Sequence, residues 1–250
     1  MLEILYQDDF LVAVNKPSGL LVHRTELARG EMEAAVQLLR DQIGQRVYPV
    51  HRLDRGTSGV LLMTLDSESA SQLGEQFMNR EVKKEYSALV RGHIHDSGSI
   101  DYPLAKLNEE KGRSRFKIEG TEQECVSHYE LIEKYTVPIP VSKYPSTRLS
   151  HIKVRPEQGR KHQIRRHFKH VFHPLIGDTR YGCRHCNHVF REAYNPDLRL
   201  MLHSASLTVT HPKSGDNLTI TSDNRGVFDD FLAFIEPYAL KHSDIAQDSN

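Results

Sequence analysis

The sequence has little that would place it in a membrane or outside the cell. No run approaches the roughly 20 apolar residues that a bilayer-spanning helix needs. The segment Met1–Tyr6 lacks the basic and apolar parts of a secretory signal. Only three cysteines occur, an odd number, which indicates reduced thiols rather than a disulfide framework. We therefore expect a cytoplasmic protein with no membrane partner.

The chain also has no net charge, because its 33 Lys and Arg residues balance its 33 Asp and Glu residues. This balance argues against a protein that is coated in positive charge. The segment from Lys143 to Lys169, however, is rich in Lys and Arg and contains a single acid, Glu157. A neutral protein with one basic zone suits a directional site for a polyanion.

No long tract of Pro, Gly or Ser marks a linker within the 250 residues. We therefore expect a single domain over residues 1–240, with a cleft, followed by a flexible tail over 241–250. Predicted strands and helices do not alternate regularly along the chain. This order favours an α+β fold with a central, mainly antiparallel sheet flanked by helices and loops.

The periodicity of apolar residues predicts the individual elements. Helical spacing predicts helices over 31–43, ended by Gly44, over 67–80, capped by Asp66, and over 160–172 and 227–239. Two strands are expected within 1–15, and the others over 20–22, 60–63, 85–90, 125–133, 149–154, 199–203, 206–211 and 217–221. Residues 103–118 are expected to form a basic loop, and 174–197 a turn-rich stretch.

Several catalytic signatures are absent as well, among them a Gly-rich phosphate loop and a G-x-S-x-G elbow. Cys183 and Cys186, with His185 and His188 nearby, are residue types that bind zinc. A closed zinc site needs four ligands, yet the chain has no second Cys pair, and Cys125 is distant in sequence. We therefore expect no metal site.

One stretch, residues 51–59, places a carboxylate between two arginines, with Asp54 between Arg52 and Arg55. The arginines favour the ionised form of Asp54, and two glycines permit a tight loop. The apolar run Val60–Met63 then predicts a buried strand. Functional side chains commonly lie on loops that a rigid element anchors in this way. A charged surface turn before a strand is the alternative interpretation at this point.

A second cluster lies at Gln158–His167, where arginines and histidines gather at the start of a predicted helix. Such residues bind phosphate, and an arginine among them can pair with a remote carboxylate. A solvated basic helix face would give the same pattern. The high local charge and the separate carboxylate loop favour the functional interpretation.

Six motifs follow one another along the chain: Lys16–His23, His51–Gly59, Lys84–Val90, Gly159–Arg165, His173–Gly182 and Arg199–His203. Together they resemble the motifs of the RluA family of pseudouridine synthases, in the same order and over nearly the whole chain. Several ordered motifs are far more specific than any one of them.

The resemblance implies isomerisation of a uridine in RNA without a cofactor. The N1 glycosidic bond is cleaved, uracil rotates, and the ring is attached again through C5. By its motif position Asp54 would be the nucleophile, which attacks either ribose C1′ or the uracil ring. Tyr86 would contact the target ring, Arg165 would pair with Asp54 and keep it charged, and Ile164 would pack under the site.

The target nucleotide has to leave the base stack before it can react. Arg52 would fill the vacated place, since a guanidinium plane stacks on bases, or would form a second ion pair with Asp54. The residues expected to bind RNA, in an RNA-binding cleft, are Arg52, Arg55, Lys16, Arg113, Arg115, Arg160, Lys161, His162 and Arg166.

The RNA is expected to be tRNA, with no required protein partner. Larger members of the family carry an S4-like RNA-binding domain before the catalytic domain, and here the first motif begins at Lys16. Residues from Asn187 resemble an insertion of the short branch that acts on uridine 65 of tRNA, although Cys183 and Cys186 depart from that pattern. The alternatives are a uridine in rRNA or elsewhere in tRNA, hydrolysis of a glycosidic bond, and a catalytically silent RNA-binding module.

Overall fold

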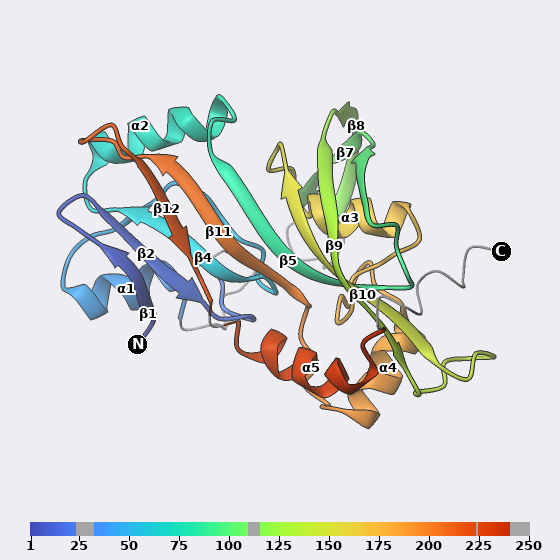
Figure 1. Cartoon of the computed structure of the whole chain (residues 1–250). Coiled ribbons are helices and arrows are strands. Elements are labelled where there is room, and N and C mark those ends of the chain that lie inside the picture. Colours follow the sequence, from blue (N-terminus) through green and yellow to red (C-terminus); the bar gives the residue numbers. More distant parts are fainter. Residues whose placement is uncertain (24–32, 110–115, 224, 241–250) are drawn as a thin grey trace.

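The computed structural model describes residues 1–23, 33–109, 116–223 and 225–240 (Figure 1). A long twisted sheet runs through the molecule and contains ten strands. Along the sheet these are β1 (Glu3–Gln7), β2 (Leu11–Lys16), β4 (Ser58–Thr64), β11 (Leu202–Thr210), β5 (Lys83–Arg91), β10 (Thr147–Pro156), β9 (Val126–Val137) and β6 (Ser97–Asp101), with β12 (Asn217–Thr221) on β11 and β3 (Tyr48–Pro49) on β4. A separate hairpin pairs β7 (Leu104–Glu109) with β8 (Phe116–Gln123).

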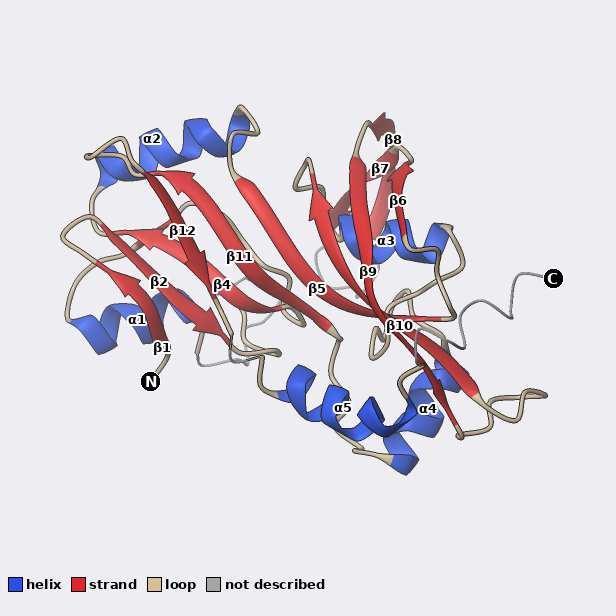
Figure 2. Cartoon of the chain, viewed as in Figure 1, coloured by secondary structure: helices blue, strands red, loops and turns tan. Residues whose placement is uncertain are grey.

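Among the described strand pairs, all are antiparallel except β4 with β11. Helices lie on both sides of the sheet (Figure 2). They are α1 (Ala35–Ile43), α2 (Ser67–Met78), α3 (Gln163–His170), α4 (Arg184–Ala193) and α5 (Val227–Ile235), which continues into the 3-10 turn η2 (Glu236–Tyr238). The predicted α+β fold with a mainly antiparallel sheet is confirmed.

The helix ends follow from local chemistry at two places. The Asp66 carboxylate accepts a hydrogen bond from the Ser69 amide at 2.8 Å and so satisfies a free donor at the start of α2. Gly44 ends α1 in the left-handed conformation, with φ of 68°. Both ends agree with the sequence predictions.

In one half of the sheet, α1 and α2 cover opposite faces. Leu39 of α1 shares a buried cluster with Val12 of β2. Leu73 of α2 shares another with Ala13, the next residue of the same strand. Because successive strand residues point to opposite faces, the two helices sandwich this half of the sheet.

The other half is built in the same way around β5. Ala88 packs in one cluster with Phe168 of α3, and the next residue, Leu89, packs in another with Phe231 of α5. Phe190 of α4 belongs to the α5 cluster, where it meets Phe231 edge to face with ring centres 5.2 Å apart. Thus α3 covers one face, and α4 and α5 cover the other.

The two halves join where β4 runs parallel to β11. The pairing is short, with Ser58 opposite His203 and Gly59 opposite Ser204. Gly59 has a φ of 103°, and a Cβ atom there would overlap the carbonyl oxygen of Ser204. Only glycine therefore fits this contact without strain, and its position in the 51–59 motif is explained by the close approach of the two strands.

Several sequence predictions about the elements were wrong. Residues 103–118, expected as a loop, contain β7 and the start of β8, because paired strands hold alternating charges as readily as alternating apolar residues. The turn-rich stretch 174–197 contains α4, which buries only Cys186, Asn187 and Phe190 and so lacks a strong apolar stripe. The strand expected at 20–22 is reduced to a single bridge between Leu21 and Ala34.

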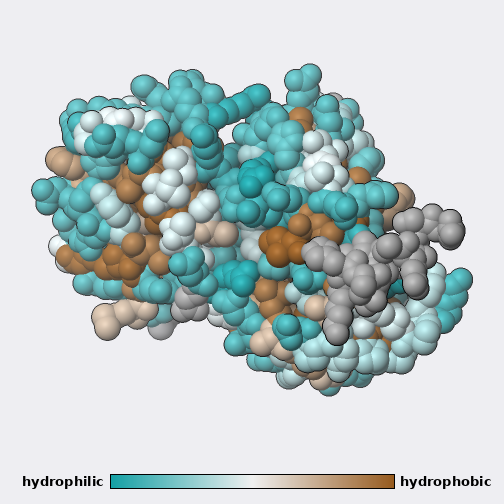
Figure 3. Space-filling model, in the orientation of Figure 1, coloured by the Kyte–Doolittle hydropathy of each residue, from teal (hydrophilic) through white to brown (hydrophobic). Residues whose placement is uncertain are grey.

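The two strands expected over 199–211 form the single strand β11, and β6 was not anticipated. The predicted tail 241–250 and the predicted start of the first helix at 31–32 lie outside the described residues. The visible face of the molecule is mostly hydrophilic, and its apolar residues are scattered rather than gathered in one patch (Figure 3). Of the helices that the structure describes, none has both the length and the apolar character to cross a bilayer.

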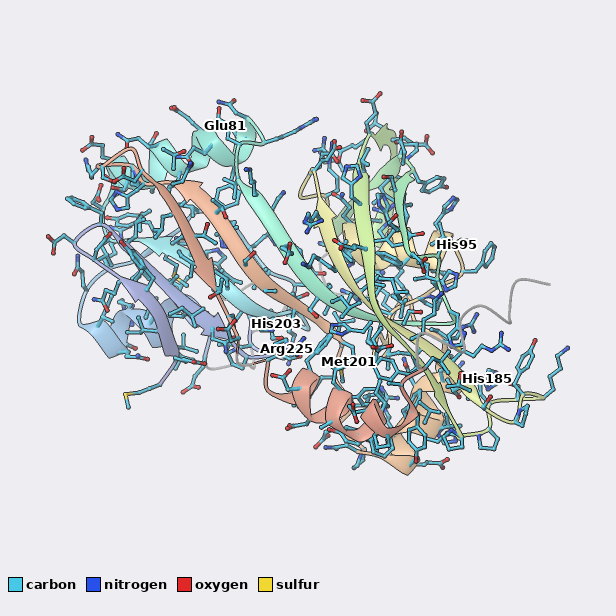
Figure 4. The ribbon with its side chains drawn as sticks, viewed as in Figure 1. Glu81, His95, His185, Met201, His203 and Arg225 are labelled. Atoms are coloured by element: carbon cyan, nitrogen blue, oxygen red, sulfur yellow. The ribbon has the colours of Figure 1, made fainter. Side chains whose placement is uncertain are left out.

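Two buried histidines lie near the sheet junction, and the start of α5 approaches them. His203 lies at the start of β11 with Arg225 close to it (Figure 4). Its Nε2 donates to the Ser222 carbonyl at 3.1 Å, so its Nδ1 accepts from the Ser58 hydroxyl at 2.9 Å. His151 bonds the Ser87 hydroxyl at 2.6 Å. Burial lowers the pKa of both rings to about 4, so both are neutral at pH 7.

We expect the protein to lose stability as the pH falls from about 6.5 towards 4. The unfolded chain binds protons on His151 and His203 near pH 6.5, whereas the folded chain does not until about pH 4. The stabilisation is therefore complete above pH 6.5 and declines by up to about 1.4 kcal/mol per pH unit for each histidine below it. Urea unfolding at several pH values measures this slope. His151→Gln should flatten it and replacement of the exposed His185 should not, so equal slopes would contradict the assignment.

Candidate active site

Asp54 lies in the loop between β3 and β4, immediately before the sheet junction. Its carbonyl accepts a hydrogen bond from the Thr57 amide at 3.0 Å, which closes a turn. The Leu53 side chain is buried in the α1 cluster and fixes the loop to the core. The backbone thus holds the Asp54 side chain just before the start of β4, where it is 19% exposed.

The segment after β2 supports the same loop from behind. The Gly19 amide donates to the Arg55 carbonyl at 2.8 Å, and the Ser18 hydroxyl donates to the Gly56 carbonyl at 2.7 Å. Lys16 is fully buried, and its Nζ donates to the carbonyls of Pro17, Leu20 and Arg55 at 2.8 to 3.2 Å. The structure therefore places Lys16 under the loop and away from any surface that RNA could reach, which revises its expected RNA contact.

Arg165 joins two carboxylates at the start of α3. Its Nη1 donates to Asp54 Oδ2 at 3.1 Å. Its Nε and Nη2 donate to the two oxygens of Asp178 at 2.7 and 2.9 Å. The bidentate pair with Asp178 fixes the plane of the guanidinium, and the remaining nitrogen is thereby aimed at Asp54. The proximity of Arg165 and Asp54 is what the sequence motifs implied.

Asp178 is the site residue that sequence reasoning missed. Its side chain is 1% exposed, and its Oδ1 also accepts from the amides of Arg180 and Tyr181 at 2.8 and 2.9 Å. Burial alone would raise its pKa, but the hydrogen bonds and charge of Arg165, together with the two backbone amides, outweigh burial and hold the pKa below its usual value. The Asn187 side chain of α4 donates from Nδ2 to the Asp178 carbonyl at 2.9 Å, and its Oδ1 accepts a hydrogen bond from the Gly177 amide at 2.9 Å. Helix α4 thus fixes the loop that carries Asp178, and Asp178 in turn fixes Arg165.

His162 precedes α3 in the left-handed conformation, with φ of 56°. Its Nε2 lies 3.7 Å from Asp54 Oδ2, and its Nδ1 bonds the Tyr181 hydroxyl at 3.0 Å. Burial lowers its pKa to about 4, more strongly than the nearby Asp54 charge raises it. His162 is therefore a neutral neighbour of Asp54 at pH 7.

Tyr86 projects from β5, between Val154 of β10 and Ser204 of β11. Burial, followed by the charge of Asp54, raises its pKa to about 12. The phenol consequently keeps its proton throughout the physiological pH range and can donate a hydrogen bond or a proton, but is not a base in its resting state.

A single pocket brings Asp54, Arg165, His162 and Tyr86 together, whereas Asp178 lines an adjoining one. Asp54 is the only carboxylate among its described lining residues. Tyr86, Ile164, Leu202 and Arg165 form its inner wall. The predicted RNA-binding residues that also line it are Arg52, Arg160, Lys161 and His162. An acidic group is thus surrounded by an apolar wall and a basic rim.

The other predicted RNA-binding residues are distributed differently. Arg55 lines an adjoining pocket on the other side of Asp54, together with Arg191 and Arg199. Arg166 is partly exposed on α3 and lines neither pocket. Arg113 and Arg115 lie outside the described residues.

Lys84 lines the same pocket, and the sequence analysis gave it no role although it opens the third motif. Its Nζ donates to the Gln158 carbonyl at 3.2 Å, and burial lowers its pKa to about 8. Its position two residues before Tyr86 puts both side chains on the same face of β5. Across the described part of the chain, no three His, Cys, Asp or Glu side chains gather in a way that could hold a metal ion.

The pocket places one carboxylate among basic and apolar side chains, and comparison with known families specifies the class of protein. Residues 10–170 match the family described as RNA pseudouridylate synthase, and the chain belongs to that family. The family predicted from the six motifs is therefore confirmed, and with it the isomerase class.

Relatives at high identity share most of the chain. The tRNA pseudouridine synthase C of Pasteurella multocida (strain Pm70) is 51% identical over 220 residues, which cover 88% of this chain and 90% of that protein. The tRNA pseudouridine synthase C of Haemophilus ducreyi is 49% identical over 221 residues, 88% of this chain and 90% of that protein.

Solved structures show the same fold at lower identity. Human RNA Pseudouridylate Synthase Domain Containing 1 superposes with a TM-score of 0.70 and 23% identity, covering 99% of this chain and 94% of that chain. Human RNA Pseudouridylate Synthase Domain Containing 4 gives a TM-score of 0.69 and 22% identity over 96% and 94% of the two chains.

Proposed function

We propose that this protein converts one uridine of tRNA, uridine 65, to pseudouridine, with Asp54 as the nucleophile. The observation that carries the proposal is the pocket in which Arg165, fixed by Asp178, aims a guanidinium nitrogen at Asp54. The tRNA substrate is supported by the relatives named tRNA pseudouridine synthase C. A uridine in rRNA is the alternative within the class.

The reaction needs only groups that the pocket contains. The ionised Asp54 attacks ribose C1′ or the uracil ring and forms a covalent bond, the N1–C1′ bond breaks, and uracil turns in the pocket. A C5–C1′ bond then forms and the bond to Asp54 breaks, and the freed carboxylate takes the proton from C5 and returns it to N1, so that no atom is gained or lost. Ile164 and Leu202 give the ring an apolar surface to turn against.

Hydrolysis of the glycosidic bond fits the pocket less well. Hydrolases of this kind pair a carboxylic acid with a carboxylate. Asp178 is the second carboxylate near Asp54, and Arg165 occupies both of its oxygens. A single free carboxylate, combined with a protonated Tyr86, suits an isomerisation that releases no sugar or base.

The basic residues at the rim of the pocket would bring the target uridine to Asp54. The target base has to leave the stack to reach Asp54. Arg52 is exposed at the pocket edge, where its guanidinium can stack in the vacated place. Arg160 and Lys161, at the start of α3, would bind the flanking phosphates, which makes affinity depend on salt.

The substrate is tested by mapping pseudouridine in total RNA from cells with and without the protein. Carbodiimide adducts block primer extension at pseudouridine, so each modified position is read directly. Loss of the stop at uridine 65 of tRNA alone is the expected result. Loss of a stop in rRNA instead would show that rRNA is the substrate. An unchanged map would contradict the proposed pseudouridine synthesis.

Tyr86→Phe should lower turnover by on the order of a hundredfold or more while tRNA affinity stays the same. The substitution removes only the hydroxyl, whose pKa of about 12 keeps its proton available in the pocket. Release of tritium from uracil C5 measures turnover, and filter binding measures affinity. Tyr48→Phe, in β3 and outside the pocket lining, is the matched control. A Tyr86→Phe rate equal to that of wild type would reduce Tyr86 to a packing role.

A further inference from the structure

The first turn of α4 carries two cysteines that the proposed reaction does not use. Cys183 is the residue that caps the helix, and the Asn187 amide donates to its carbonyl at 2.9 Å. Figure 4 places His185, which lies between the two cysteines, at the start of α4. Residues three apart in a helix have Cβ atoms about 5–6 Å apart on one face. Both side chains belong to the same part of the core, since Cys183 packs against the cluster that contains Cys186.

The two thiols have unlike surroundings. Cys183 is partly exposed, whereas Cys186 is 1% exposed within the α5 cluster. The positive charge of Arg91, at the end of β5, acts on both thiols and favours their ionised forms. An accessible thiol beside a cation, followed three residues later by a buried thiol, is the arrangement of an attacking and a resolving cysteine.

The acidity of the thiols agrees with this division of roles. Burial would raise the pKa of Cys183, but hydrogen bonds from the backbone and side chain of Cys186 and from Arg91 outweigh it and lower the pKa. Burial, followed by the charge of Cys183, raises the pKa of Cys186 to about 12. Cys183 is therefore the thiol that ionises first.

Cys125 provides a contrast within the same chain. It is fully buried, its sulfur donates to the Tyr102 carbonyl at 3.4 Å, and it lies 3.3 Å from Nε2 of His167. Burial raises the pKa of its thiol. A reagent that reaches Cys183 through solvent has no such path to Cys125.

We propose that Cys183 and Cys186 form a redox-active dithiol, which a small-molecule disulfide oxidises to an intramolecular disulfide. The Cys183 thiolate attacks one sulfur of the reagent and expels its other half as a thiolate, which leaves a mixed disulfide. Cys186 loses its proton to solvent and attacks the Cys183 sulfur, which expels the second half. The two cysteines lose two electrons and two protons in total, and the reagent is reduced to two thiols.

The chain offers a direct readout, because Arg184 lies between the two cysteines. The folded protein is incubated with oxidised glutathione, free thiols are blocked with iodoacetamide, and the protein is digested with trypsin without reduction. We expect peptides 181–184 and 185–191 to remain joined, and the peptide with Cys125 to be alkylated. Alkylation of both Cys183 and Cys186 at every concentration of oxidised glutathione would overturn the proposal.

Variants separate the two roles. Cys186→Ser should stop at the mixed disulfide, with one glutathione retained on Cys183, whereas Cys183→Ser should take up none. Arg91→Met should slow alkylation of Cys183 at neutral pH severalfold, because removal of the cation raises the thiol pKa and lowers the thiolate fraction. Arg148→Met, an exposed arginine on β10, is the matched control. Equal glutathione uptake by the two cysteine variants, or equal alkylation rates for the two arginine variants, would contradict the assigned roles.

Discussion

Asp54→Asn is expected to reduce pseudouridine formation by a factor of about 10⁴ or more. An amide cannot form the covalent bond that the proposed reaction requires, and no other described carboxylate lines the pocket. Tritium release from C5 of uracil in a tRNA transcript measures the rate. A residual rate within tenfold of wild type would rule out Asp54 as the nucleophile.

The same variant should remain folded and should bind tRNA. Arg165 keeps its bidentate pair with Asp178, and the new amide oxygen can still accept from Arg165 Nη1, so we expect stability to change by less than about 1 kcal/mol. Removal of a negative charge from a pocket that receives a polyanion should leave affinity equal or slightly tighter. Asp197→Asn, in the adjoining pocket, is the matched control and should retain full turnover. A silent RNA-binding module predicts equal behaviour of the two variants in every assay.

Asp178→Asn should lower the free energy of unfolding by about 3–5 kcal/mol, because it leaves the buried Arg165 charge without a full partner. If the amide oxygen takes the place of Oδ1, the amide NH₂ takes the place of Oδ2 and meets the Nε–H of Arg165, a second donor. Urea unfolding measures the loss. Turnover of the folded fraction should also fall, since the guanidinium that faces Asp54 then loses its bidentate pair.

Asp229→Asn is the control that separates the effect of burial on the free energy of unfolding from the effect of ion pairing. Asp229 also binds an arginine, with its Oδ1 2.6 Å from Arg225 Nε, but the two side chains are 39% and 27% exposed. An exposed pair of this kind contributes about 0–1 kcal/mol. Equal losses for Asp178→Asn and Asp229→Asn would show that burial of the Arg165 pair adds no stability.

Periodicity in the sequence was enough to predict the elements that bury one clear face. Helix α2 has its cap at Asp66 and its apolar residue Leu73 where the spacing placed them. The hairpin of β7 and β8 was missed because its strands carry charged residues, and pairing between backbones does not depend on apolar side chains. Helix α4 was missed because Asn187, one of its few buried residues, is polar and is buried for its hydrogen bonds.

The site was predictable as far as its motifs extended. Asp54 and Arg165 were paired in advance because both belong to motifs with recognisable residues. Asp178 received no role because nothing local distinguishes a buried carboxylate from a turn residue, and its partner lies in another element. Lys16, the first residue of the first motif, was expected among the RNA-binding residues, and lysines are normally exposed. Its burial depends on three carbonyls that meet only in the folded chain.

The parallel contact between β4 and β11 has a consequence for synthesis of the chain. Ser58 bonds His203 across 145 residues, and Leu202 of β11 forms part of the wall around Asp54. Contacts this distant form late, because a long loop has to close first. A chain emerging from the ribosome carries Asp54 early, but we expect it to complete the pocket only when β11 has left the exit tunnel. Nascent chains should then leave RNA unmodified, and the first active molecule should be a nearly finished one.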